Sequence, residues 1–139
     1  MMIFGFKKTK GKYKNKKVEY DGFGFDSKKE KDRYVFLKDA EKKGIITDLK
    51  RQVKFELIPS IKEKYVKQLK TKEKECERTV QLAVSYTCDF QYKKDGAIVV
   101  EDVKASPKFI DPTYILKEKI FRWKFGFPVK RVYKANEEI

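Results

Sequence analysis

Histidine is absent from this sequence of 139 residues, and cysteine occurs only twice. Cys76 and Cys88 are too far apart for a C-x-x-C motif, so we expect neither a structural zinc site nor catalysis by histidine. Any catalytic chemistry must therefore come from carboxylates, lysines and a metal ion that prefers oxygen ligands.

Long apolar runs are missing as well. No segment approaches the 18 or so apolar residues of a membrane span, and the N-terminus lacks the charged, apolar and small regions of a signal peptide. The sequence therefore predicts a soluble cytoplasmic protein with no membrane partner.

Acidic residues are outnumbered, because 21 Asp and Glu stand against 35 Lys and Arg and leave a net charge of +14. Such an excess repels itself unless a polyanion neutralises it, which makes nucleic acid the expected partner. A membrane surface is the alternative, but residues 1–17 offer neither an apolar face nor a lipidation signal.

Apolar residues still make up 40% of the chain, which is enough to build one folded domain. Residues 1–17 are rich in Lys and Gly without periodicity, and they predict a flexible basic arm or a solubilising tail. The single domain is expected to span residues 18–139.

The first half of this domain begins with alternation over residues 17–25, which indicates a short hairpin. Ser27 and Glu30 form a capping-box pattern that starts a helix over about residues 28–43. An alternating strand follows from residue 48 until Pro59 ends it. The charged residues 60–78 are compatible with either a long loop or an extended hairpin.

The second half is expected to pair two strands. Alternation from residue 79 to 92 predicts the first, Asp95-Gly96 predicts a tight turn, and residues 97–105 resemble a buried strand. Asp111 and the proline after it then begin a helix that reaches Lys124, and the aromatic residues of this helix should pack in the core. A last strand is expected near residues 129–133. This order predicts a mixed α/β fold.

The turn determines which residues of the two strands face each other. A two-residue turn places Asp89 opposite Asp102. Two facing carboxylates repel each other and need a compensating cation, which Mg²⁺ or Mn²⁺ supplies. Because side chains alternate, Lys104 shares a face with Asp102, whereas Glu101 points to the other face. Lys104 is then placed to orient or deprotonate a water molecule, or to neutralise charge on a phosphate.

The combination of Glu30 on a helix, Asp89 on one strand and the D-x-K of Asp102 and Lys104 on the next resembles the PD-(D/E)xK nuclease superfamily. The segments FGFDSKKEKDRYVFL, DLKRQVKFEL, YTCDFQY and VVEDVKA resemble small phage-encoded members related to Holliday junction resolvases, over about residues 12–125. Cys88 stands where the superfamily's name has proline.

This resemblance implies a restriction-endonuclease-like mixed β-sheet flanked by helices. It also implies metal-dependent hydrolysis of DNA, with Asp89, Asp102 and Glu30 as the metal site. A Holliday junction resolvase in the host cytoplasm would need two active sites, and hence a homodimer. A linear-duplex repair or restriction-type nuclease and a non-catalytic nucleic-acid-binding protein are the alternatives.

Several of these residues also have alternative interpretations. Glu30 is alternatively only the capping partner of Ser27, and the two aspartates are alternatively solvated or paired with Lys104. Gln52 is a possible further site residue, or a polar residue that faces solvent. The second helix carries four basic residues that suit phosphate contacts or a solvated face: Lys117, Lys119, Arg122 and Lys124.

Overall fold

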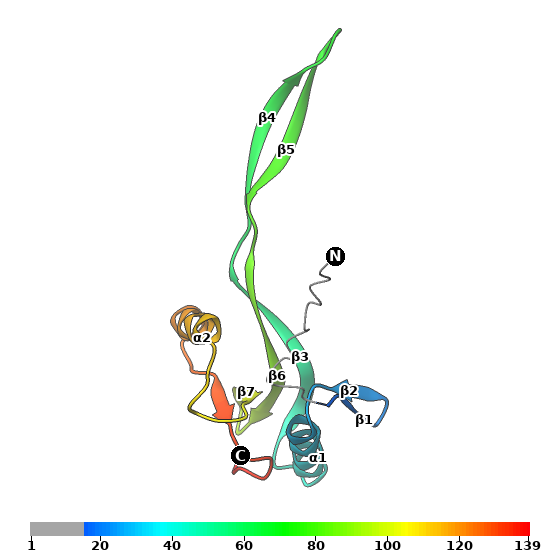
Figure 1. Ribbon diagram of the computed structural model, residues 1–139, viewed down its shortest axis with the longest axis vertical. Helices are drawn as coiled ribbons and strands as arrows, with labels where there is room; N and C mark the ends of the chain where they lie inside the picture. The colour runs from blue at the N-terminus through cyan, green and yellow to red at the C-terminus, as the bar shows by residue number, and fades with distance from the viewer. Residues whose placement is uncertain (1–15) are drawn as a thin grey trace, which may run out of the picture.

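The computed structural model describes residues 16–139, so almost all of the predicted basic arm, residues 1–17, lies outside the described residues. Two helices and eight strands make up the described part of the chain (Figure 1). Their order is β1 (Val18–Tyr20), β2 (Phe23–Phe25), α1 (Lys28–Lys42), β3 (Thr47–Ile58), β4 (Ile61–Gln68), β5 (Glu73–Gln81), β6 (Val84–Lys94), β7 (Ala97–Val103), α2 (Pro112–Phe125) and β8 (Lys130–Val132).

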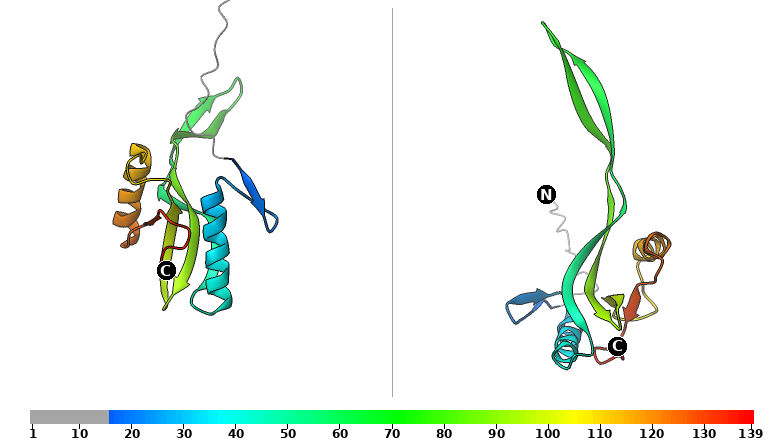
Figure 2. Two further views of the ribbon diagram at one scale, coloured as in Figure 1. Left: turned by 60° about the horizontal axis from the view of Figure 1, so that its bottom comes forward. Right: turned by 180° about the vertical axis from the view of Figure 1, so that it is seen from behind.

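A four-stranded sheet with the order β3-β6-β7-β8 forms the centre of the molecule. β6 is antiparallel to both of its neighbours, whereas β7 and β8 are parallel, so the sheet is mixed. The helices α1 and α2 lie on opposite sides of it (Figures 1 and 2). The predicted mixed α/β class is therefore confirmed.

The tight turn at Asp95 and Gly96 has the predicted register. Lys94 pairs with Ala97, and the pairing continues without a shift to Phe90 and Glu101. Both turn residues have positive φ, 51° at Asp95 and 79° at Gly96, as a two-residue hairpin turn of type I′ requires. The local turn chemistry thus sets the register of the hairpin that carries the two aspartates.

The sheet has a hydrophobic core on each side, and β6 contributes to both. Tyr86 and Cys88 pack on the α2 side, whereas Phe90 and Tyr92 pack on the α1 side. These four residues alternate with more polar ones along the strand, but regular alternation does not predict this change of side. The change occurs at Asp89, which the β3–β6 register places opposite Gln52, a non-glycine residue with φ of 51°.

The charged segment after Pro59 is an extended hairpin rather than a loop. β4 and β5 form a separate two-stranded sheet that projects away from the body of the protein and continues the direction of β3 and β6 (Figures 1 and 2). The strand predicted from residue 79 is consequently two strands, because β5 ends at Gln81 and β6 begins at Val84. We call β4, β5 and their connection, residues 61–81, the hairpin arm.

A buried ion pair fixes α1 against the sheet. Arg33 and Glu101 are both fully buried, and Nε and one terminal amino group of Arg33 donate to the two Glu101 oxygens at 2.8 Å. The Tyr92 hydroxyl donates to the same carboxylate at 2.7 Å. Glu101 therefore lies on the face opposite Asp102, as predicted, and has a structural partner there.

The second helix begins and ends at the predicted signals. The Asp111 side chain accepts a hydrogen bond from the Thr113 N–H, and Gly126 ends the helix with φ of 82°. Phe121 is fully buried, but Trp123 is 84% exposed, so the prediction that the aromatic residues of this helix pack in the core is wrong for Trp123. Neither of the two helices in residues 16–139 is long and apolar enough to span a membrane.

Candidate active site

Asp89 and Asp102 lie where β6 and β7 begin to separate. The Asp89 N–H donates to Oδ1 of Asp102 at 3.0 Å, and the Val103 N–H donates to Oδ2 of Asp89 at 2.9 Å. Beyond the Phe90 and Glu101 pair, these side-chain bonds take the place of the strand ladder. The two carboxylates are thus brought together by the backbone that carries them.

Neither aspartate is a solvated surface residue. Asp102 is only 4% exposed, and the Tyr86 hydroxyl donates to its Oδ2. Asp89 is partly buried. Within residues 16–139, no lysine or arginine nitrogen lies within 4.0 Å of either carboxylate, so the alternative of an ordinary ion pair with Lys104 is also wrong.

The electrostatics of the pair favour a bound cation. Burial raises the pKa of Asp89 to about 7, and the negative charges of Asp102 and Glu30 add to the effect. Burial also raises the pKa of Asp102, although the Tyr86 hydroxyl and Lys104 oppose that rise. Carboxyl groups that resist ionisation for these reasons gain stability when a positive charge is placed beside them.

Lys104 packs on an aromatic ring beside the carboxylates. Its Nζ lies 3.5 Å from the ring centroid of Tyr114, a cation–π contact that holds the ammonium group at the edge of the site. The Tyr114 hydroxyl is buried and makes no well-formed hydrogen bond to the described residues, although its burial and the nearby Asp102 and Glu118 carboxylates raise its pKa. One turn further along α2, Glu118 accepts two hydrogen bonds from Arg131, at 2.8 and 2.7 Å, which anchors the helix to β8.

Glu30 belongs to the site as well as to the start of α1. Ser27 is the N-cap and accepts a hydrogen bond from the Glu30 N–H at 3.1 Å. Glu30 is 5% exposed, and its Oε1 accepts a long hydrogen bond of 3.4 Å from Gln52. Burial and the charge of Asp26 raise the pKa of Glu30. Gln52 is an exposed residue, and its side-chain amide contacts this candidate site residue.

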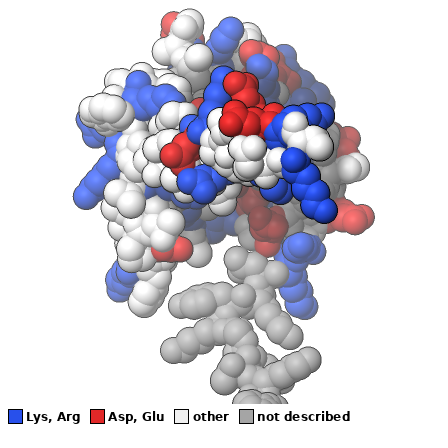
Figure 3. All heavy atoms as spheres, turned by 90° about the horizontal axis from the view of Figure 1, so that it is seen from above, with Lys and Arg blue, Asp and Glu red and all other residues white. Residues whose placement is uncertain are grey.

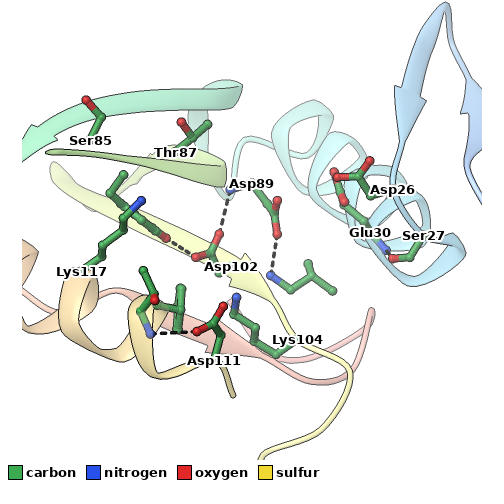
Figure 4. Close-up of a pocket in the computed structure, with 14 residues that line it drawn as sticks. Asp26, Ser27, Glu30, Ser85, Thr87, Asp89, Asp102, Lys104, Asp111 and Lys117 are labelled. Carbon is green, nitrogen blue, oxygen red and sulfur yellow. Dashed lines mark hydrogen bonds between the residues drawn. The ribbon is translucent and has the colours of Figure 1, made fainter. Parts of the chain in front are cut away.

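These side chains line one cleft of about 500 Å³ between α1, the sheet and α2. Figure 4 shows Asp89, Asp102 and Lys104 close together, with Glu30 on α1 to one side. The residues that line it are Asp26, Ser27, Glu30, Ser85, Tyr86, Thr87, Asp89, Asp102, Val103, Lys104, Asp111, Thr113, Tyr114 and Lys117. The four predicted catalytic residues, Glu30, Asp89, Asp102 and Lys104, therefore share a cleft.

A family model described as "Protein of unknown function (DUF1064)" matches residues 10–136. The chain belongs to this DUF1064 family. No curated protein and no solved structure matches the chain. The match covers α1, the sheet and α2, and so includes the entire cleft.

The basic residues of α2 do not form one group in this DUF1064 chain. Lys117 lines the cleft, whereas Lys119 and Arg122 line a different hollow beside β8. Lys124 donates to the Glu56 carbonyl oxygen at 2.7 Å, and so contacts β3 instead. Of the four residues that the sequence indicated for phosphate contacts, Lys117 alone lines the cleft.

Several cleft residues were not predicted as site residues, and three of them lie beside the predicted ones: Tyr86, Tyr114 and Asp26. The Tyr86 hydroxyl donates to Asp102, the Tyr114 ring lies against Lys104, and the charge of Asp26 adds to the effect of burial that raises the pKa of Glu30. The strand pattern contains no signal that the Tyr86 hydroxyl reaches Asp102. Such contacts depend on how α2 and β6 pack, which local periodicity does not encode.

The donor chemistry of the cleft suits a hard divalent cation. Asp89, Asp102 and Glu30 present carboxylate oxygens, the ligands that Mg²⁺ and Mn²⁺ prefer. Oδ1 of Asp89 receives no hydrogen bond from any described residue. Among residues 16–139 no group of three or more such side chains is close enough together to hold a metal ion as it stands. Asp89 and Asp102 are therefore the primary candidate ligands.

Proposed function

We propose that this DUF1064 protein is a metal-dependent endonuclease that hydrolyses phosphodiester bonds in DNA. The observation that carries the proposal is the pair of the partly buried Asp89 and the buried Asp102 on neighbouring strands, with Lys104 in the same cleft. A net charge of +14 supports a polyanionic substrate. The resemblance to PD-(D/E)xK nucleases supports the same reaction.

Each carboxylate has a role in this proposal. Asp89 and Asp102 hold Mg²⁺ or Mn²⁺, and Glu30 contributes from α1. When bound, the ion supplies positive charge that attracts phosphate and lowers the pKa of a water molecule. Tyr86 and the Asp89 N–H orient Asp102 by hydrogen bonds to its two oxygens. The strand backbone thereby holds the ligand in place before any substrate arrives.

Lys104 and Tyr114 act on the substrate side of the cleft. The Lys104 ammonium orients the attacking water or neutralises charge that develops on the phosphate, whereas the neutral Lys104 amine accepts a proton from that water. The Tyr114 hydroxyl donates a hydrogen bond to a phosphate oxygen. Lys117, one helical turn from Tyr114 and in the same cleft, contacts a neighbouring phosphate.

The experiment is cleavage of labelled DNA by the full chain with Mg²⁺, with Mn²⁺ and with chelator. Asp89→Asn and Asp102→Asn should each lower the rate by orders of magnitude while DNA binding is retained, because they remove ligands and not phosphate contacts. Asp39→Asn is the matched control, since this aspartate lies on α1 outside the cleft. Full activity in chelator, or in either cleft variant, contradicts the assignment.

The finer proposal is a structure-selective Holliday junction resolvase that acts as a homodimer. Two-fold symmetry would place two clefts against opposing strands of a four-way junction. Initial rates on a fixed junction and on its component duplexes, with sedimentation of the free protein, test this proposal. Equal rates favour a linear-duplex nuclease, and metal-independent binding without any cleavage favours a non-catalytic DNA-binding protein.

A further inference from the structure

The hairpin arm is an exposed two-stranded ribbon, and its many charged side chains indicate that it binds a partner. Every residue of β4 is exposed, and so is every residue of β5 except the half-buried Cys76. A lone two-stranded hairpin is only marginally stable in water, because it has no core to bury. The arm nevertheless extends for eight residues of β4, or about 26 Å at a rise of roughly 3.3 Å per residue.

The register divides the charges of the arm between two faces. Paired residues point to the same side, and successive pairs alternate. One face carries three positive charges and one negative; this basic face consists of Glu63, Tyr65, Lys67, Lys74, Cys76 and Arg78. The other carries two positive charges and three negative; this acidic face consists of Lys62, Lys64, Val66, Gln68, Glu73, Glu75, Glu77 and Thr79.

The outer part of the basic face holds positive charges without acidic partners. Near the base, Arg78 pairs with Glu63 at 2.9 Å and lies over the Tyr65 ring. Further out, Lys67 directly faces Lys74, and neither has an acidic group within 4.0 Å in the part of the chain that the structure describes. Directly facing like charges destabilise a ribbon. Lys70 and Lys72, in the turn between the strands, add two more positive charges.

We propose that the hairpin arm binds the phosphate backbone of DNA through its basic face and its tip. A two-stranded ribbon fits the major groove of B-DNA, and lysines there neutralise phosphates without reading sequence. Phosphates would also relieve the repulsion between Lys67 and Lys74. The inference rests on the proposed function for its choice of DNA as the polyanion.

The position of the arm relative to the cleft supports this role. β5 leads into β6, whose residues Ser85 and Thr87 line the cleft on the way to Asp89 (Figure 4). Lys74 is 15 residues before Asp89, so an extended chain places it up to about 50 Å away. That upper limit corresponds to roughly 15 base pairs at 3.4 Å each. Seen from above, Lys and Arg also occur on the body around the arm, with acidic residues among them (Figure 3). The arm therefore holds duplex well beyond the bond that is cut.

The test compares two double variants of the full chain, each of which removes two lysines from the same hairpin. Lys67→Ala with Lys74→Ala changes the basic face, and Lys62→Ala with Lys64→Ala is the matched control on the acidic face. Affinity for a fluorescent 30-base-pair duplex is measured in chelator at several salt concentrations. The first variant should bind at least tenfold more weakly, and the slope of log affinity against log salt should fall by about 1.8. The control should stay within twofold of the wild-type protein.

The outcomes separate this inference from the proposed function. If the wild-type protein binds DNA but never cleaves it with Mg²⁺, the nuclease proposal is contradicted. In that case, a lower DNA affinity of the basic-face variant still supports DNA binding by the hairpin arm. Normal cleavage with equal affinities for the two variants overturns the arm proposal. Loss of self-association without loss of DNA affinity in the basic-face variant also overturns it, in favour of a second copy as the partner.

Discussion

The buried pair of Arg33 and Glu101 leads to a quantitative prediction about stability. Glu101→Gln keeps the size of the side chain but leaves the Arg33 guanidinium buried without its countercharge. Breaking one side of a buried ion pair costs about 3–5 kcal/mol. Two further acceptors of Arg33, the Ala135 carbonyl at 3.1 Å and the Glu137 carbonyl at 2.5 Å, remain in place. We therefore expect a loss near the lower end, about 3 kcal/mol of unfolding free energy.

The assay is urea unfolding followed by circular dichroism, with the slope m compared between variants. Glu118→Gln is the matched control, because Glu118 makes the same two-bond contact with Arg131, but with side chains 20% and 29% exposed. Solvent screens that pair, so its loss should cost about 1 kcal/mol or less. A Glu101→Gln effect no larger than that of Glu118→Gln would refute the reasoning.

The Glu101→Gln variant also tests which carboxylates belong to the proposed active site. Glu101 points away from the cleft, so folded Glu101→Gln protein should keep its rate of DNA cleavage at a temperature where it remains folded. Replacing both charges with apolar residues, Arg33→Met with Glu101→Leu, should recover part of the lost stability, because no buried charge is then left unpaired. A severe loss of cleavage by folded Glu101→Gln would mean that this carboxylate, and not Asp102, belongs to the working pair.

Three further outcomes follow from the cleft. Folding raises the pKa of Asp89 to about 7 from an ordinary value near 3.9, so ionisation of Asp89 destabilises the metal-free protein. In urea unfolding with chelator, the unfolding free energy should fall by on the order of 2 kcal/mol from pH 5 to pH 7, and Asp89→Asn should make this fall smaller. Tyr114→Phe keeps the ring beneath Lys104 but removes the hydroxyl, so single-turnover cleavage should slow by roughly tenfold while the unfolding free energy does not decrease. An unchanged cleavage rate would contradict the proposed contact between this hydroxyl and phosphate. Lys104→Ala should slow cleavage by about a hundredfold or more, whereas Lys108→Ala, an exposed lysine outside the cleft, should match the wild-type protein in the same assay.

Much of the fold follows from signals that act over short stretches of chain. Ser27 begins α1, Asp111 begins α2 and Pro59 follows the end of β3, in each case because a single residue changes which backbone hydrogen bonds are available. The clearest case is the Asp95-Gly96 turn. Its two residues with positive φ set the register of β6 and β7 up to Phe90 and Glu101, and the next residues, Asp89 and Asp102, then lie close together.

The tertiary structure decided the contacts between segments that are far apart in the chain. Periodicity placed Glu101 on the face opposite Asp102, but only packing shows that Arg33, 68 residues earlier, is its buried partner. The change of side at Asp89 lies opposite Gln52, a residue with positive φ in another strand, and regular alternation does not predict it. The charged composition of residues 60–78 was equally compatible with a loop.

The sequence alone therefore determined the class of fold, the hairpin register and the facing pair of aspartates, because each depends on neighbours within one turn or one hairpin. The tertiary structure decided that Glu30, Lys104 and Tyr114 share a cleft with that pair. It also decided that Lys67 and Lys74 face each other on an exposed arm. These arrangements depend on how helices and strands pack or pair over long stretches of the chain, and local patterns of apolar and polar residues do not specify such packing.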